Sequence, residues 1–197
     1  MALGPVRGGM RLLLTFTTDQ SWCEARWERV RHLFEPTFPE SQRKSTAELM
    51  NLFSHRFYAM HAVWQGEVAV GMAFTARLPD LELLFIDYMA VAPDLRSRGI
   101  GAQLIHYLVG WAKDCRGMVG EVDAPDPGEP EQSEAHRRIA FYRNNGFACV
   151  PAGFSPGPHQ RFSLIVRLFD TTAPMPDLAL VLEQIQRVHR AARRPLP

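Results

Sequence analysis

The sequence predicts an α/β fold (α+β-like), in which one domain of residues 1–197 holds a mixed, twisted β-sheet of about seven strands. About four helices would flank this sheet, and a further helix would follow at the C-terminus. Three observations support the prediction. Strand and helix patterns alternate after four early strands, the 197 residues suit one domain with a sizeable core, and the chain contains no internal repeat. We place the core of the domain at about 10–170 and a C-terminal extension at 171–197.

The first half of the chain predicts a strand, two helices and three further strands. Cys23, Trp27, Val30 and Phe34 share one face of the first helix, and prolines then mark a loop. Gly66 marks the turn of a hairpin between the second and third strands. The predicted strands are 10–17, 57–64, 68–76 and 81–91, and the predicted helices are 22–34 and 47–55.

The second half of the chain predicts alternating helices and strands, closed by a hairpin. Ile100, Leu104 and Leu108 line one face of a helix, and Asn145 and Gly146 end the next helix with residues suited to left-handed φ. The final helix is amphipathic and is expected to serve as a packing element or to form a homodimer. The predicted helices are 100–111, 135–144 and 178–190, and the predicted strands are 118–122, 147–151 and 161–169.

A short segment after the strand 81–91, which runs into the start of the helix 100–111, predicts an anion site. Its sequence is Arg96-Ser97-Arg98-Gly99-Ile100-Gly101-Ala102. Unpartnered backbone N–H groups and the helix dipole attract an anion to such a helix start. Gly99 and Gly101 let a phosphate approach the backbone, and Arg96 and Arg98 add forked donors. We therefore predict a site for a diphosphate.

Two common phosphate motifs do not fit this site. Leu104 stands where a dinucleotide fingerprint needs its third glycine, and the chain has no Gly-Lys-Ser/Thr run of a P-loop. The segment instead follows Arg/Gln-x-x-Gly-x-Gly/Ala. In that spacing it resembles the acetyl-coenzyme A loop of the GNAT N-acetyltransferase superfamily. A Gly-rich helix start with two solvated arginines is the alternative.

A second pattern, Phe141-Tyr142-x-x-x-Gly146-Phe147, is similar to the other hallmark of that superfamily. The predicted order of elements over about 10–170 also looks like its fold. The resemblance implies an acetyl-CoA-dependent N-acyltransferase that moves an acetyl group to a primary amine by direct attack, with no metal. Many members carry Asn at the position of Ala135 and Ala at that of Arg138, where this chain differs.

The resemblance also implies roles for individual residues. Tyr142 would protonate the leaving thiolate, because the ordinary pKa of a phenol is close to that of a thiol; a half-buried aromatic is the alternative. Members with a base on the central strand place it four or six residues before the valine that ends the strand, and these positions are Asp87 and Phe85 here. Asp87 is therefore the first candidate, and Glu121 on the next strand is the second. Strand alternation would put Phe85, Asp87 and Met89 on one face. Asp87 could alternatively bind a substrate cation or pair with an arginine.

The same resemblance implies the contacts of acetyl-CoA (coenzyme A) as co-substrate. The backbone of Met89, Ala90 and Val91 would bind the pantetheine arm as an added strand would. The diphosphate would be held by Arg96, Ser97, Arg98, Gly99, Ile100, Gly101 and Ala102. A non-catalytic acyl-CoA-binding sensor or interaction module would need this loop too, but neither Tyr142 nor Asp87.

Composition limits the compartment and the partners. A net charge of +1 gives no global field for nucleic acid or an anionic membrane, and no apolar run approaches a membrane span. Three widely spaced cysteines suggest a reducing compartment, and the scarcity of lysine is typical of a GC-rich genome. We therefore expect a bacterial, cytoplasmic protein. Six acids between 121 and 134 suggest a cationic acceptor, namely a polyamine, an amino sugar or a peptide amine, although a solvated acidic loop is the alternative.

Overall fold

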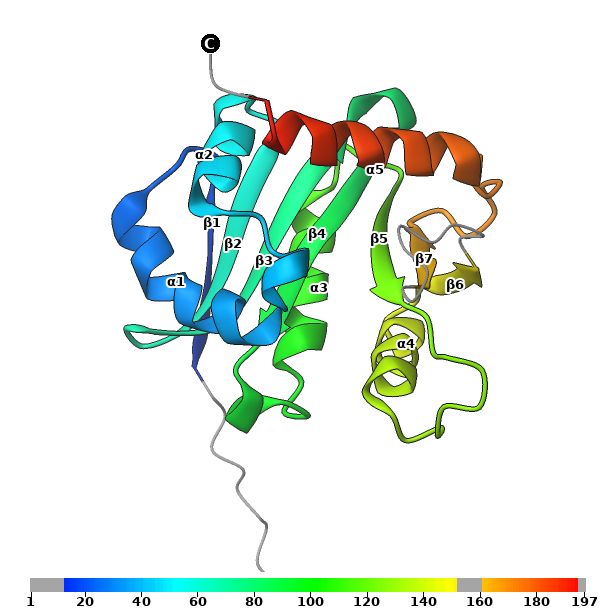
Figure 1. Cartoon of the computed structure of the whole chain (residues 1–197), viewed down its shortest axis with the longest axis horizontal. Helices are drawn as coiled ribbons and strands as arrows, with labels where there is room; N and C mark the ends of the chain where they lie inside the picture. The colour runs from blue at the N-terminus through cyan, green and yellow to red at the C-terminus, as the bar shows by residue number, and fades with distance from the viewer. Residues whose placement is uncertain (1–12, 152–160, 195–197) are drawn as a thin grey trace, which may run out of the picture.

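A computed structural model describes residues 13–151 and 161–194 of the chain. Within these residues, seven strands form one mixed sheet in the order β1-β2-β3-β4-β5-β7-β6, and helices lie on both of its faces (Figure 1). The predicted fold class is confirmed. The strands are β1 (Leu14–Asp19), β2 (Tyr58–Gln65), β3 (Val68–Leu78), β4 (Leu83–Val91), β5 (Gly117–Asp123), β6 (Ala148–Pro151) and β7 (Phe162–Leu168), and the helices are α1 (Glu24–Thr37), α2 (Thr46–Ser54), α3 (Ile100–Trp111), α4 (Glu134–Asn144) and α5 (Leu178–Ala192).

The sheet separates two hydrophobic cores. The first core joins α1, α2 and α5 to one face, and the second joins α3 and α4 to the other. Both cores follow from apolar residues spaced three or four apart along each helix. Among the described helices, none is both long and apolar enough to cross a membrane. The helix residues of the first core include Trp27, Val30, Phe34, Leu49, Leu52, Val181 and Ile185, and those of the second include Ile100, Leu104, Leu108, Ile139 and Tyr142.

Several element boundaries differ from the predicted ones. The first helix continues through Pro36 to Thr37, about one turn beyond the predicted end, because the Phe38 N–H still bonds to the Phe34 carbonyl. At the end of α4 only Gly146 has a left-handed φ, of +81°, whereas Asn145 does not. Residues 10–12 of the first predicted strand lie outside the described residues.

The parallel strands β4 and β5 pair only over their first four residues. The pairs run from Leu83 with Gly117 to Ile86 with Gly120. Beyond these pairs β5 continues alongside β7, and the two strands diverge toward the end at which α4 lies (Figure 1). This divergence, called the β4–β5 split below, opens the sheet next to the predicted phosphate loop.

A β-bulge lies on β4 at the same level. Phe74 of β3 pairs with Tyr88 and Thr75 pairs with Ile86, so Asp87 is the extra residue. The bulge reverses the alternation of side chains along the strand. The expectation that Phe85, Asp87 and Met89 share one face is therefore wrong for Met89: Phe85 packs in the first core, and Met89 packs against the second.

A fully buried histidine connects the strands on the α3 side of the sheet. His61 Nδ1 lies 2.8 Å from Thr18 Oγ1, and its Nε2 lies 2.8 Å from Thr75 Oγ1. The hydroxyl of Tyr107 is 2.8 Å from the same Thr18 oxygen. Burial lowers the pKa of His61 to about 3, so the ring is neutral at physiological pH.

This buried histidine should make the fold sensitive to acid. Its pKa in the folded state lies below the ordinary 6.5, so the unfolded chain takes up the proton first. The contribution to stability is complete above pH 6.5 and is lost as the pH falls toward 3. Between pH 6.5 and 5, the native protein should lose about 1.5 kcal/mol more unfolding free energy than His61→Gln. Urea denaturation at the two pH values measures this difference.

The exposed His106 on α3 offers the matched control. His106→Gln should keep the acid sensitivity of the native protein. An equal loss of stability in the native protein and in His61→Gln would contradict a neutral, buried imidazole.

Candidate active site

A cleft of about 500 Å³ lies between the end of β4, the start of α3 and α4. Both predicted motifs line it, which means that segments about forty residues apart in the sequence face the same space. Arg98 is exposed beside the cleft and is not part of its lining. The predicted residues that line it are Met89, Ala90, Val91, Arg96, Ser97, Gly99, Ile100, Gly101, Ala102 and Tyr142.

The predicted phosphate loop has the backbone shape of an anion cradle. Ser97 has a φ of +60° and Gly99 a φ of +80°, and Gly99 is the N-cap of α3. The first intrahelical bond runs from the Gln103 N–H to the Gly99 carbonyl. The preceding N–H groups at the helix start have no partner within the helix and can bind an anion.

Gly101 lets the two sides of the cleft come close together. A Cβ atom on this residue would lie 3.0 Å from Cζ of Phe141 and 3.5 Å from Cε of Met89. The first distance is shorter than an ordinary van der Waals contact, so a Cβ atom here would require the Phe141 ring to shift by a few tenths of an ångström. The loop residues and the α4 motif therefore fit each other across the cleft.

Tyr142 lies in the wall of this cleft with 8% of its surface exposed. Its ring packs edge-on against Phe141 and Phe147, with centroids 5.1 and 5.4 Å away. Burial raises the pKa of Tyr142 to about 12, although the charge of Arg138 acts in the opposite direction. The phenol is therefore protonated at neutral pH and can donate a hydrogen bond.

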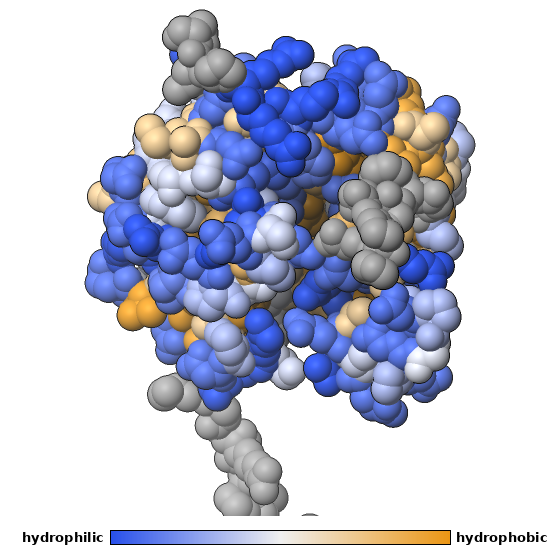
Figure 2. Space-filling view, in the orientation of Figure 1, coloured by the Kyte–Doolittle hydropathy of each residue, from blue (hydrophilic) through white to orange (hydrophobic). Residues whose placement is uncertain are grey.

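A second cavity, of about 330 Å³, lies beyond the β4–β5 split and is called the acceptor cavity below. The two predicted acids Asp87 and Glu121 line it, together with Lys44 and His189, which sequence reasoning did not select. Arg138 lines both the cleft and this cavity, so the two spaces adjoin at its side chain. Figure 2 shows this face as mostly hydrophilic, and hollowed beside the lobe that contains α4.

Asp87 is held in a buried ion pair. Lys44 Nζ lies 2.8 Å from each of its carboxylate oxygens, and the Tyr58 hydroxyl donates a further hydrogen bond. The side chains of Lys44 and Asp87 are only 9% and 3% exposed. Burial and the nearby carboxylate raise the pKa of Tyr58 well above its ordinary value, which keeps its proton in place. The partner of Asp87 is therefore a lysine from the segment before α2.

Glu121 is the first residue of β5 beyond its pairing with β4. One of its carboxylate oxygens lies 3.2 Å from Nε2 of His189, which belongs to α5. The sequence offered only one signal for His189, namely its place next to Val188 on the apolar face of the final helix. The contact with β5 depends on the tertiary packing of α5.

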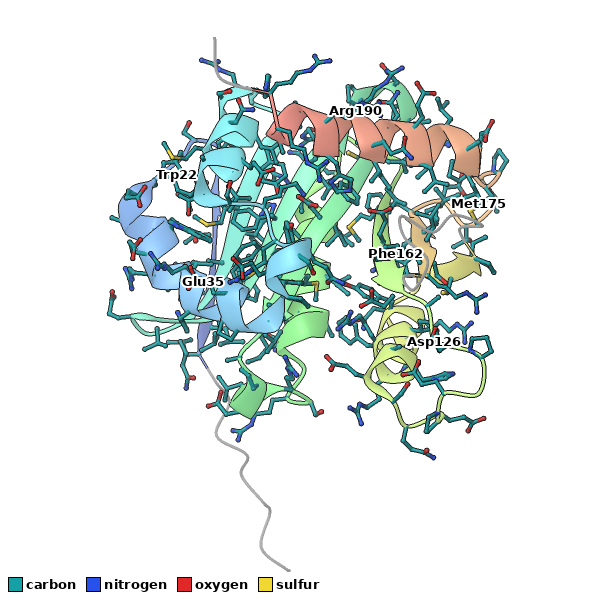
Figure 3. The ribbon with its side chains drawn as sticks, viewed as in Figure 1. Trp22, Glu35, Asp126, Phe162, Met175 and Arg190 are labelled. Atoms are coloured by element: carbon teal, nitrogen blue, oxygen red, sulfur yellow. The ribbon has the colours of Figure 1, made fainter. Side chains whose placement is uncertain are left out.

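Several acidic side chains in and beside the loop between β5 and α4 form ion pairs or hydrogen bonds within the chain. Arg138 pairs with Asp123 at 2.8 Å and with Glu134 at 3.2 Å, and Glu129 accepts a hydrogen bond from the backbone of Asp126. Asp126 itself lies on the loop beside α4 (Figure 3). Both acidic and basic side chains line the acceptor cavity, in equal numbers if His189 is left aside, so its wall has no large excess of negative charge.

Comparison with known proteins identifies relatives of this fold. Among solved structures, a Bacteroides thetaiotaomicron protein described as an acetyltransferase from the GNAT family has 20% identity and a TM-score of 0.63, with 84% of this chain and 89% of that chain covered. An aminoglycoside 6'-N-acetyltransferase complexed with coenzyme A has 16% identity and a TM-score of 0.60, with 83% and 99% covered. Arabidopsis thaliana NAA60 in complex with acetyl-CoA has 17% identity and a TM-score of 0.60, with 80% and 99% covered.

These likenesses show the fold, and a family model gives the more specific assignment. No curated protein matches the sequence significantly. The model of the acetyltransferase (GNAT) family matches residues 27–147, which is more than half of the chain and includes both sequence motifs. The chain therefore belongs to the GNAT acetyltransferase family.

Proposed function

We propose that this protein is an acetyl-CoA-dependent N-acetyltransferase that transfers the acetyl group to a primary amine by direct attack in a ternary complex. One observation supports this most strongly. The phosphate loop and Tyr142 line one cleft, and that cleft meets the acceptor cavity at Arg138, beside the β4–β5 split. A donor in the cleft and an amine in the cavity would thus meet near the split, and such positioning can contribute roughly 7–11 kcal/mol to catalysis.

Successive parts of the cleft could bind the diphosphate, the pantetheine arm and the thioester of acetyl-CoA, in the order in which these groups follow one another in the molecule. The N–H groups at the start of α3 would bind the diphosphate. Beyond Ile86 the edge of β4 is not paired with β5, so the backbone of Met89–Val91 would bind the amide groups of the pantetheine arm. This order would bring the thioester to the split, where the sheet is open to both spaces.

Tyr142 would donate a hydrogen bond to the leaving sulfur. Its pKa of about 12 makes it a weaker acid than an ordinary thiol, whose pKa is about 8.5. Full proton transfer to the thiolate would therefore be uphill. We propose that Tyr142 stabilises the negative charge that develops on sulfur as the C–S bond breaks, and that the thiolate takes its proton from water afterwards.

Of the two predicted acids, Glu121 is better placed than Asp87 to assist removal of the amine proton. Both oxygens of Asp87 already accept hydrogen bonds from Lys44, whereas the Glu121 carboxylate has only His189 as a hydrogen-bond partner among the described residues. We propose that Asp87 fixes the bulge beside the thioester and that Glu121 belongs to the group that accepts the proton. The acceptor would be a polyamine, an amino sugar or a peptide amine.

A non-catalytic acyl-CoA-binding module is the second candidate function, and the buried Lys44–Asp87 pair favours it, because this pair occupies the first predicted base. We also propose a reducing, cytoplasmic location, since Cys23, Cys115 and Cys149 are all free. Whether the protein forms a homodimer stays a prediction.

The two functions differ in turnover. We expect the protein to bind coenzyme A in calorimetry and to release thiol from acetyl-CoA with at least one of spermidine, glucosamine or a short peptide with a free N-terminus. Thiol release with a colorimetric reagent measures the rate. Tight binding without release for every amine would support the binding module instead.

Replacing Tyr142 should slow the chemical step without weakening the binding of coenzyme A. In Tyr142→Phe we expect kcat to fall about 10- to 150-fold, the effect of losing one hydrogen bond to a charged group. Tyr107→Phe is the matched control, because the Tyr107 hydroxyl contacts Thr18 on the α3 side, outside the cleft. Unchanged kcat in Tyr142→Phe would contradict a role at the sulfur.

Removing the charge of Asp87 should destabilise the fold strongly. Asp87→Asn leaves the Lys44 ammonium buried without a counter-charge, and we expect a loss of about 3–5 kcal/mol in unfolding free energy. The double variant Asp87→Asn/Lys44→Met should recover most of it. Urea denaturation measures each value.

An exposed ion pair provides the control for this experiment. Glu67 pairs with Arg29 at the surface, and Glu67→Gln should cost less than about 1 kcal/mol. A similarly small effect of Asp87→Asn would refute the buried pair. Separately, the rate of thiol release by the double variant Asp87→Asn/Lys44→Met would show whether the Asp87 carboxylate itself takes part in the reaction.

A further inference from the structure

We propose that His189, paired with Glu121, accepts the proton of the attacking amine, so that the C-terminal helix α5 completes the active site. This inference rests on the proposed N-acetyltransferase function and assigns its base. His189 lies outside the segment that the family model matches, which ends at residue 147.

Helix α5 is fixed to the domain along its length. Its apolar side is buried in the first core through Val181, Ile185 and Val188. Gln184 donates a hydrogen bond of 3.0 Å to the Asp80 carboxylate, which follows β3. The helix runs across the end of the sheet at which β4 and β5 are still paired (Figure 1). A side chain on its inner face therefore has a defined position relative to β5.

The end of α5, next to His189, is held by a buried amide. Nδ2 of Asn51, on α2, donates to the carbonyl oxygens of Ala191 and Ala192 at 2.7 and 3.1 Å, and also to that of Arg194. Ala191 and Ala192 belong to the last turn of α5 and Arg194 follows it, and the Ala191 carbonyl also accepts a hydrogen bond from the Arg194 N–H at 3.3 Å. The contact fixes the turn that carries His189.

The imidazole of His189 faces the acceptor cavity. Its Nε2 lies 3.2 Å from Glu121, and its ring packs edge-on against Phe85 of β4, with centroids 5.9 Å apart. The side chains of His189 and Glu121 are 36% and 23% exposed, and both line the cavity. The next residue, Arg190, points outward from α5 (Figure 3). This pair is thus partly shielded but open to a ligand.

The pair has the arrangement of a base and its orienting acid. A neutral imidazole has one N–H donor and one acceptor nitrogen. With Nε2–H donating to Glu121, the second ring nitrogen, which has no protein partner among the described residues, is free to accept a proton. As the amine nitrogen bonds to the thioester carbon and the C–S bond breaks, the amine proton would pass to this nitrogen, directly or through one water. Glu121 would stabilise the imidazolium.

Other groups around the cavity are engaged elsewhere. Glu48 accepts a hydrogen bond from the Ser45 backbone, Asp123 pairs with Arg138, and Asp87 pairs with Lys44. Imidazole is also the side chain that most readily exchanges a proton near neutral pH. The titratable groups that share the cavity with the pair are Arg43, Lys44, Glu48, Asp87, Tyr88, Asp123, Arg138 and Arg193.

The test compares His189→Gln and His189→Ala with the native protein, using acetyl-CoA with spermidine, glucosamine and a short peptide as acceptors. We expect kcat to fall roughly 10²- to 10⁴-fold, with the KM for acetyl-CoA changed by less than about twofold. The acid side of the pH profile of kcat/KM should flatten. Added imidazole should restore part of the rate of His189→Ala, an effect that a purely structural role would not produce.

Two further variants keep the test decisive. His106→Gln, on the exposed surface of α3, should retain the native rate. Glu121→Gln preserves the shape of the side chain and should lower kcat about tenfold or more. If circular dichroism shows that the His189 variants do not fold, this variant alone tests the proposed role of the pair. Native kcat in His189→Gln or in Glu121→Gln would overturn this inference while leaving the proposed function intact. Absence of thiol release by the native protein with every amine would overturn both.

Discussion

The divergence of β4 from β5 is the constraint on which the site depends. The two strands share four residue pairs and then separate, at the level where the bulge places Asp87 outside the pairing with β3. The split leaves backbone groups of β4 available on one side and exposes Glu121 on the other. A closed sheet would have neither the cleft beside α3 nor its junction with the acceptor cavity.

The side chains around the split explain how an open sheet remains ordered. Lys44 and Tyr58 hold the Asp87 carboxylate from two different elements, and each would be costly to bury alone. These partners converge on the residue that the bulge leaves outside the pairing with β3. On the same face, Asn51 ties α5 to α2. The walls of the acceptor cavity are thus built from contacts between distant segments.

The parts of the site that could be predicted from the sequence are those whose chemistry is local. Gly99 indicates a positive φ, and Gly101 indicates a close approach between α3 and a neighbouring group. Tyr142 belongs to a short pattern that ends in Gly146-Phe147. The bulge could not be predicted, because strand alternation assumes regular pairing, and this assumption misplaced Met89. The Lys44–Asp87 and Glu121–His189 contacts join residues 43 and 68 positions apart. Such contacts depend on packing that no local pattern encodes. The fold class was predictable because the helices carry apolar residues at helical spacing, and because the central strands β2 and β3 are nearly continuous buried runs.

In the proposed mechanism, the β4–β5 split brings the thioester of acetyl-CoA between the Tyr142 hydroxyl and the acceptor cavity. A crystal structure of the protein with acetyl-CoA tests this most directly. We expect the diphosphate at the start of α3, the pantetheine arm along Met89–Val91, and the sulfur within hydrogen-bond distance of Tyr142. Coenzyme A bound outside the cleft, or a Tyr142 hydroxyl directed into the core, would contradict this mechanism.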